Sequence, residues 1–208
     1  MATWPVSIII PNYNGEQILP RALSGVSEAV RAYAGQSEII VVDDASRDNS
    51  IDLISQNFSD IKLVRHEVNK GFSEAIHSGV KAAVYPIVIL LNSDVYPDRH
   101  FIDPLIRWFD REDTFSVSPL ILDHGGNPSR VSWNLVKLIR GEIRSSNWDL
   151  ANALELMRKR QSLKSLFAAG GSAAISKDMF VQLGGFLSIY RPLYYEDRDL
   201  GTRAWKLG

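Results

Sequence analysis

Polar side chains that can bind a ligand follow directly on four short apolar runs of this chain. The four clusters are Pro11-Asn12-Tyr13-Asn14, Asp43-Asp44-Ala45-Ser46, Asn69-Lys70-Gly71-Phe72 and Asn92-Ser93-Asp94. A carboxylate such as Asp44 accepts the N–H groups of a nucleotide base, and a ring such as Tyr13 packs on it. Asp94 offers the oxygen ligand that Mg²⁺ and Mn²⁺ prefer. Together the clusters favour a ligand site, which could grip a nucleotide by its base and ribose while a divalent ion serves the diphosphate.

A second group of candidate residues lies near the end of the chain, in "LYYEDRDLGTRAW". The stretch reads as the start of a helix, in which Asp199 and Arg203 are four residues apart and form a surface ion pair. Asp197 lies on another side of this helix, where it faces the protein or a substrate. In a first helical turn the helix dipole keeps such a carboxylate ionised, as a general base requires. Helix-capping charge is the alternative explanation for Glu196, Asp197 and Asp199.

Two pairs of glycines admit two explanations each. Gly170-Gly171 either lets a sugar approach the backbone closely or forms a loop with positive φ angles. For Gly184-Gly185 a helix C-cap is favoured.

Known cofactor fingerprints are missing from the sequence. "PNYNGEQ" has a single glycine where a dinucleotide-binding loop needs several, which argues against a nicotinamide or flavin cofactor. A Gly-x-x-x-x-Gly-Lys-Ser/Thr loop is absent too, so this is not a P-loop enzyme. The four histidines have no metal-ligand spacing, and we assign them no role.

The elements around the polar clusters alternate between strand and helix patterns. Apolar, β-branched runs predict strands, and apolar residues at helical spacing predict helices. The predicted strands are residues 6–10, 38–42, 61–64 and 87–91, and the predicted helices are residues 17–33, 50–58 and 72–84. This alternation predicts a parallel α/β sheet with helices on both faces. Each cluster alone is explained by turn chemistry, but ligands bind at the carboxyl edge of such sheets, where all four would meet.

The rest of the chain is less regular, and its composition changes around Pro119. We predict helices at residues 103–109 and 149–161, and strands at residues 115–118 and 168–175. We expect one domain over residues 1–208, with a nucleotide-sugar-binding half, 1–118, and an acceptor-binding half, 119–208, that share a core. The basic run Arg158-Lys159-Arg160 near Lys164 would suit an anionic membrane surface, but a solvated helix face explains it better.

Composition excludes several classes of protein. The 208 residues are 45% hydrophobic and 23% charged with a net charge of -1, so we expect no nucleic-acid partner. Cysteine is absent, which rules out disulfides and fits a reducing, cytoplasmic compartment. The first residues lack a charged signal-peptide start, and no apolar stretch reaches the roughly 20 residues of a membrane span. Contact with the inner face of a membrane stays open.

Six segments together resemble family 2 glycosyltransferases in their order and spacing. They are "VSIIIPNYNGEQILPRAL", "EIIVVDDASRDNSIDLI", "NKGFSEAIHSGVKAA", "ILLNSDVYPD", "GGSAAISKDMFVQLGGF" and "YYEDRDLGTRAW". The resemblance implies the GT-A fold, a nucleotide-diphosphate sugar donor, a divalent metal (Mg²⁺ or Mn²⁺), and transfer with inversion. It also implies a saccharide or lipid-linked saccharide acceptor, as in polysaccharide or cell-envelope glycan synthesis.

The resemblance assigns roles to individual residues. Asp44 would bond the base, Asp94 would bind the metal, and Asp197 occupies the place of the catalytic base. The full set of nucleotide-binding residues implied is Pro11, Tyr13, Asn14, Asp43, Asp44, Gly71, Phe72 and Asn92. We expect Gly170, Gly171 and Glu196 to lie beside the acceptor or the donor sugar.

This chain departs from the family pattern in ways that keep two alternatives open. Asn92 replaces the first acidic residue of the family's Asp-x-Asp motif, and the chain stops at Gly208, where members usually continue. These features predict a truncated or short member, and they suit a non-catalytic sugar-nucleotide binding module. A sugar nucleotidyltransferase is the other alternative, although it would need a glycine-rich basic loop after the first strand.

Overall fold

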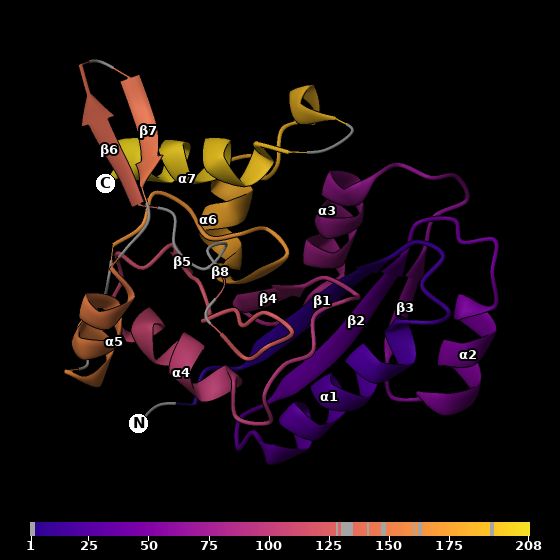
Figure 1. Cartoon of the computed structure of the whole chain (residues 1–208). Helices are drawn as coiled ribbons and strands as arrows, with labels where there is room; N and C mark the ends of the chain where they lie inside the picture. The colour runs from indigo at the N-terminus through magenta and orange to yellow at the C-terminus, as the bar shows by residue number, and fades with distance from the viewer. Residues whose placement is uncertain are drawn as a thin grey trace.

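A six-stranded sheet organises the chain (Figure 1). The computed structural model describes residues 3–127, 129, 135–140, 142–146, 149–159, 161, 164–191 and 194–208. The strands in spatial order are β3 (Lys62–Arg65), β2 (Ser37–Asp43), β1 (Val6–Asn12), β4 (Ile87–Leu91), β8 (Ser172–Ser176) and β5 (Ser116–Val117). The first four are parallel, and β8 runs antiparallel to both β4 and β5.

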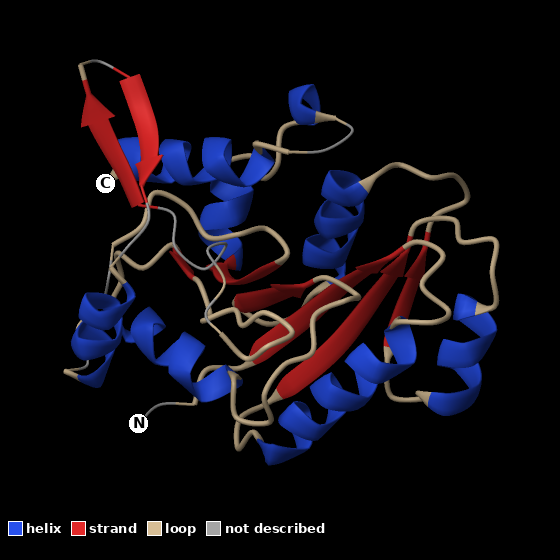
Figure 2. Ribbon diagram, in the orientation of Figure 1, coloured by secondary structure: helices blue, strands red, loops and turns tan. Residues whose placement is uncertain are grey.

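Helices cover both faces of this sheet, as Figure 2 shows. The α-helices of the described residues are α1 (Leu19–Ala32), α2 (Ser50–Asn57), α3 (Phe72–Ala82), α4 (Ile102–Ile106), α5 (Leu150–Arg158), α6 (Lys177–Gln182) and α7 (Glu196–Leu207), and α5 lies away from the sheet. Single 3₁₀ turns are η1 (Arg107–Asp110) and η3 (Ser188–Tyr190), and a separate hairpin joins β6 (Leu135–Ile139) to β7 (Glu142–Ser146).

The continuous apolar run of β1 follows from burial on both sides. Side chains alternate along a strand, so Ile8 and Ile10 enter the cluster under α1 and α4, whereas Ile9 enters the cluster under α3 and α6. Gly79 of α3 lies directly over Ile9, where a Cβ would come within 2.3 Å of the Ile9 Cγ2. Close helix–sheet packing thus fixes α3 above the carboxyl end of the sheet.

The predicted alternation is confirmed for the first seven elements, with shifted boundaries. The first helix begins at Leu19 with Pro20 in its first turn, where proline needs no backbone N–H, and not at Gln17. The helix predicted at 103–109 is divided into α4 and η1, and the strand predicted at 168–175 begins only at Ser172. The β6–β7 hairpin was not predicted. Arg160 lies outside the described residues.

None of the helices among the described residues has the length and apolar character needed to cross a membrane.

Candidate active site

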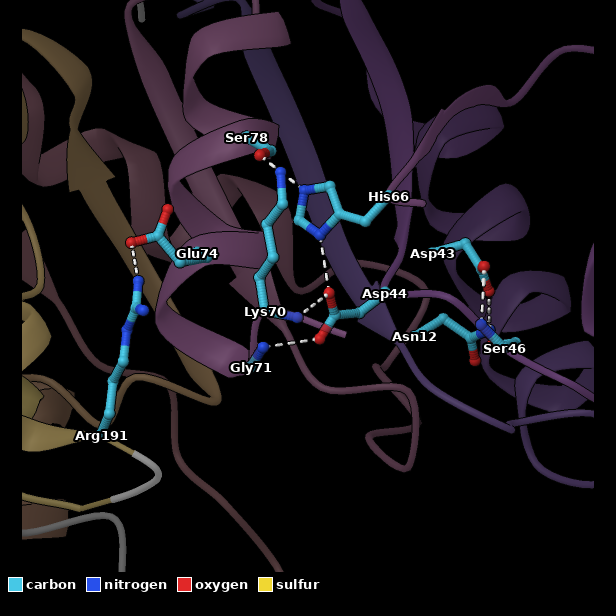
Figure 3. Close-up of polar contacts among 10 residues, drawn as sticks. All are labelled: Asn12, Asp43, Asp44, Ser46, His66, Lys70, Gly71, Glu74, Ser78 and Arg191. Atoms are coloured by element: carbon cyan, nitrogen blue, oxygen red, sulfur yellow. Dashed lines mark hydrogen bonds and ion pairs between the residues drawn. The ribbon is translucent and has the colours of Figure 1, made fainter. Parts of the chain in front are cut away.

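The carboxyl ends of β1 and β2 are joined by buried polar contacts. The Asn12 Nδ2 donates to the Asp43 Oδ1 at 2.9 Å and to the Ser46 Oγ at 3.2 Å (Figure 3). Asp43 is fully buried, and its Oδ2 accepts the backbone N–H of Ser46 at 3.1 Å. The Asp43 Oδ2 therefore holds the turn after β2 and the Asp43 Oδ1 joins β2 to β1, while the Asn12 Oδ1 has no partner among the described residues.

Asp44 is the centre of a second, separate network. Its Oδ1 accepts the backbone N–H of Lys70 at 2.8 Å, and its Oδ2 accepts that of Gly71 at 2.7 Å. The His66 Nδ1 lies 2.6 Å from the same Oδ1, and the His66 Nε2 lies 2.8 Å from the Ser78 Oγ. Figure 3 shows His66, after β3, and the Lys70 and Gly71 N–H groups, just before α3, around the Asp44 carboxylate, with Ser78 of α3 behind His66.

The loop after β1 presents a free aromatic ring. Tyr13 is 51% exposed, and it follows Asn12, the buried last residue of β1, whereas Pro11 is partly exposed. Asn14 has a φ of 53°, a left-handed conformation that asparagine tolerates, and its Oδ1 accepts the Arg47 backbone N–H at 2.8 Å. Asn14 thus shapes the loop, and the Tyr13 ring is left available to a flat ligand.

The first turn of α3 lies beside this loop. Gly71, with a φ of 86°, adopts a conformation that suits glycine, and open space surrounds the position of a Cβ there. The next residue, Phe72, stacks its ring on Phe186 with the centroids 6.1 Å apart. Gly71 and Phe72 therefore connect Asp44 to the C-terminal half of the chain.

The end of β4 contacts the start of β8. The Asn92 N–H donates to the Gly171 carbonyl at 2.8 Å, and a Cβ on Gly171 would lie 2.6 Å from the Asn92 Nδ2. Neither Gly170 nor Gly171 has a positive φ, so close approach and not loop conformation explains Gly171. Positive φ angles occur at Gly184 and Gly185, just after α6, as the C-cap interpretation predicts.

Asp94 lies in a turn and not on an extension of the strand. The Val95 N–H donates to the Asn92 carbonyl at 3.0 Å, and the Asp94 side chain is exposed. No group of three or more His, Asp or Glu side chains in the described part of the chain is placed to hold a metal ion. One exposed carboxylate fits an ion such as Mg²⁺ or Mn²⁺ that takes its other ligands from a diphosphate and water.

Asp197 faces the same glycines from the first turn of α7. Its Oδ2 accepts the Gly170 N–H at 3.3 Å, and its Oδ1 accepts the Arg198 N–H at 2.7 Å. A Cβ on Gly170 would contact Phe72, Phe186 and the Asp197 Cβ at 3.4–3.7 Å. The predicted residues Phe72, Asn92, Gly170, Gly171 and Asp197 therefore gather at one place.

The neighbouring Glu196 differs from Asp197 in its surroundings. Glu196 is only 8% exposed, and its Oε2 has no hydrogen-bond partner among the described residues. Burial raises the pKa of the Glu196 carboxyl, and the Asp197 charge adds to this effect.

The predicted Asp199–Arg203 pair is confirmed, with a Nε–Oδ2 distance of 2.7 Å. It is more than a surface pair, because Arg203 also donates to the carbonyls of Leu183 and Gly185. These bonds attach α7 to the turn after α6.

Several residues to which the sequence assigned no role hold the two halves together. The His77 Nε2 accepts the Phe186 N–H at 3.0 Å, and burial, above all, lowers the pKa of His77. Arg191 reaches back to Glu74 of α3 (Figure 3). One sequence signal could have pointed to His66, because this residue follows the third predicted strand at the carboxyl edge of the sheet. Glu74, His77 and Arg191 had none.

Comparison with known proteins places the chain among glycosyltransferases. The family model described as glycosyl transferase family 2 matches residues 7–184. The undecaprenyl-phosphate 4-deoxy-4-formamido-L-arabinose transferase of Pectobacterium atrosepticum is 36% identical over 107 residues, which cover 50% of this chain and 33% of that protein. Polypeptide N-acetylgalactosaminyltransferase 6 of Bos taurus is 25% identical over 187 residues, 82% of this chain and 30% of that protein. The chain thus spans about a third of the length of these relatives.

Two solved structures share the fold. GalNAc-T7, crystallised with UDP, GalNAc and Mn²⁺, aligns with a TM-score of 0.75 at 20% identity over 99% of this chain and 41% of that one. The mannosyltransferase PcManGT from Pyrobaculum calidifontis, in complex with GDP-Man and Mn²⁺, aligns with a TM-score of 0.70 at 20% identity over 98% of this chain and 52% of that one. The predicted GT-A fold is confirmed by these similarities.

Proposed function

Because this chain belongs to glycosyl transferase family 2, we propose that it moves a sugar from a nucleotide-diphosphate sugar to an acceptor hydroxyl with inversion at the anomeric carbon. The observation that supports the proposal most is a pair of contacts at neighbouring glycines: Asn92 donates to Gly171, and Gly170 donates to Asp197, so the proposed base lies close to the end of β4. In this proposal residues 1–118 bind the donor, and residues 119–208 contribute to acceptor binding.

The donor nucleotide is assigned to the loops after β1 and β2. Tyr13 supplies an exposed ring for the base, and Asp44 supplies a carboxylate that is fixed before the ligand arrives. Gly71 leaves open space beside that carboxylate, so a ligand can approach the backbone there. Pro11 and Asn14 shape the β1 loop, while buried Asp43 supports it through Asn12 and Ser46.

Asp94 is the residue that would hold a divalent ion, with the Asn92 side chain directing a ribose hydroxyl or the diphosphate. When bound, the ion would neutralise charge on the leaving diphosphate. Mn²⁺ in the GalNAc-T7 and PcManGT structures supports a divalent ion here, without deciding between Mg²⁺ and Mn²⁺.

Asp197 is the proposed general base for the acceptor hydroxyl. Two backbone N–H groups donate to its oxygens and hold the carboxylate in place in the first turn of α7. Removing a proton from the attacking hydroxyl contributes roughly 10²–10⁴-fold to the rate. Glu196 and the Gly170–Gly171 backbone are proposed to border the acceptor or the donor sugar.

The acceptor is proposed to be a saccharide or a lipid-linked one, in cell-envelope or other polysaccharide synthesis. The names of the undecaprenyl-phosphate sugar transferases, to which half of this chain is 36% identical, support a lipid-linked acceptor. Such an acceptor would bring the protein to a membrane surface from the cytoplasmic side.

Transfer assays on two variants test this assignment. We expect Asp197→Asn to lower sugar transfer, or slow hydrolysis of the donor, by roughly 10²–10⁴-fold while nucleotide affinity stays nearly unchanged. Asp94→Ala should instead weaken Mn²⁺-dependent nucleotide binding in calorimetry. Asp178→Asn, an exposed acid in the first turn of α6, is the matched control and should alter neither. Normal turnover by Asp197→Asn would show that the base assignment is wrong.

A further inference from the structure

The Asp44 carboxylate has already used most of its capacity to accept hydrogen bonds. A carboxylate offers about four lone-pair positions, two on each oxygen. Lys70 N–H and the His66 ring both approach Oδ1, at 2.8 and 2.6 Å, whereas Gly71 N–H alone approaches Oδ2, at 2.7 Å. Oδ1 is therefore full, and Oδ2 has room for one more donor.

His66 is held so that it must donate to Asp44. Its side chain is 5% exposed, and that of Asp44 is 6% exposed, so water does not compete for this contact. Both Asp44 oxygens already accept backbone N–H groups, and a carboxylate oxygen offers only acceptor positions, so the His66 Nδ1 is the donor in this contact. The Ser78 hydroxyl, 2.8 Å from Nε2, fixes the ring from the other side.

Open space adjoins the oxygen that is still free. Gly71, whose N–H bonds Oδ2, has a φ of 86°, and no heavy atom lies within 4 Å of the position a Cβ would take. A ligand can therefore reach Oδ2 along the Gly71 backbone. Oδ1, by contrast, lies between the His66 ring and the Lys70 backbone N–H (Figure 3).

The bases of nucleotide sugars differ in what they offer to such a carboxylate. Guanine presents two adjacent donors, N1–H and the 2-amino group, which suit a bidentate contact that needs a free lone pair on each oxygen. Uracil and thymine present a single imide N–H between two carbonyl groups, which needs one lone pair only. Adenine and cytosine place a ring acceptor beside their amino group, and the carboxylate repels it.

We propose that this site selects a base with a single imide N–H, uracil or thymine, over guanine, and that His66 sets the choice by occupying the second lone pair of the Asp44 Oδ1. The inference rests on the proposed function, since it assumes that Asp44 faces the base of a nucleotide donor. His66 is a positioning residue in this scheme and does not touch the ligand.

Calorimetry with UDP, dTDP and GDP in the presence of Mn²⁺ tests the selection. One missing charge-assisted hydrogen bond corresponds to roughly a ten- to hundredfold weaker affinity for GDP. The UDP and dTDP titrations separate the two imide bases, whose rings differ by the thymine methyl group. Equal or tighter binding of GDP by the wild-type protein would overturn the proposal.

Three variants isolate the part played by His66. His66→Phe keeps a ring but removes the donor, so the preference over GDP should shrink by roughly tenfold as Oδ1 becomes free. His66→Asn restores an N–H near the Nδ1 position and should keep the wild-type preference. Ser78→Ala is the matched control, because it removes the outer partner of His66 without exposing Asp44, and it too should keep the preference.

The outcomes of these experiments distinguish a failure of this inference from a failure of the proposed function on which it rests. If a folded His66→Phe protein keeps the full preference for UDP and dTDP over GDP, the role of His66 is wrong. If that variant does not fold, the preference measured on the wild-type protein still tests the proposal. Failure of all three nucleotides to bind with Mn²⁺ would overturn the donor site itself. Binding of UDP that Asp44→Asn leaves unaltered would show that the base lies elsewhere, which refutes the inference but not the transferase.

Discussion

Gly201 allows α7 to lie directly against the segment that precedes Gly170, and its replacement by alanine offers a test of how Asp197 is positioned. A Cβ at Gly201 would lie 2.3 Å from the Leu166 carbonyl oxygen and 2.6 Å from the Phe167 Cβ. The first of these atoms is backbone, and it cannot rotate out of the way. Gly201→Ala therefore forces the helix and this segment apart.

The size of the effect follows from these distances. Since ordinary Cβ contacts begin near 3.4 Å, the separation has to increase by about 1 Å at the Leu166 carbonyl. Overpacking of this kind costs about 1–3 kcal/mol, against which alanine regains up to about 1 kcal/mol of helix propensity. We expect a net loss of about 1–2 kcal/mol in the free energy of unfolding.

Activity should suffer more than stability. Asp197 lies one turn before Gly201, and its contact with the Gly170 N–H is already 3.3 Å long. Because a 1 Å displacement of a catalytic group can cost on the order of 10²-fold in rate, transfer should fall by about that factor. Nucleotide affinity should hold, since α7 makes no contact with Asp44 among the hydrogen bonds of that network.

Urea unfolding, a transfer assay and nucleotide calorimetry on the same preparations measure the three quantities. Gly25→Ala is the matched control: it is also helical, but its nearest neighbour, the Pro97 Cδ, is 3.5 Å away, so alanine there should be neutral or stabilising. A Gly201→Ala protein with wild-type stability and turnover would refute the close packing of α7 and the positioning of Asp197 that depends on it.

Two further predictions concern stability. Ala45 has a φ of 62°, so Ala45→Gly should relieve backbone strain and raise the free energy of unfolding by about 1 kcal/mol, measured in urea. Burial lowers the pKa of His77, so between that lowered value and about 6.5 the unfolded chain binds a proton that the folded chain does not. Stability should therefore fall as the pH decreases through this window, and His77→Asn, which keeps an acceptor for the Phe186 N–H, should reduce that dependence. If the free energy of unfolding of His77→Asn depends on pH as in the wild-type protein, groups other than His77 cause that dependence.

The polar carboxyl edge of the sheet, where we propose that the donor binds, was predictable because its signals are local. Each of β1, β2 and β4 is an apolar run that stops at polar residues, and the chain direction alone brings Asn12, Asp43 and Asn92 to one edge. The internal geometry of the edge was not predictable. That Asp43 turns inward while Asp44 meets Lys70 and Gly71 depends on side-chain packing between elements far apart in sequence.

The strands and contacts of the second half of the chain could not be predicted, for a different reason. The β6–β7 hairpin lies outside the main sheet, and β8 is antiparallel to β4, so neither follows from the strand–helix alternation of the first half. The contacts of Glu74 with Arg191 and of His77 with Phe186 span 117 and 109 residues. No spacing rule on a single sequence pairs residues across such separations.

Those long-range contacts share one element, helix α3, which explains how the proposed donor site and the proposed base are positioned relative to each other. Helix α3 packs on β1 through Gly79, and its N-cap residue Gly71 donates to Asp44. The side chains that meet the C-terminal half, Phe72, Glu74 and His77, project from the same helix. Helix α3 therefore contacts Asp44 at its N-cap and the segment of residues 186–191, which leads to Asp197, along its side. Because a helix is rigid, α3 sets the position of that segment relative to Asp44, and the connecting loops do not.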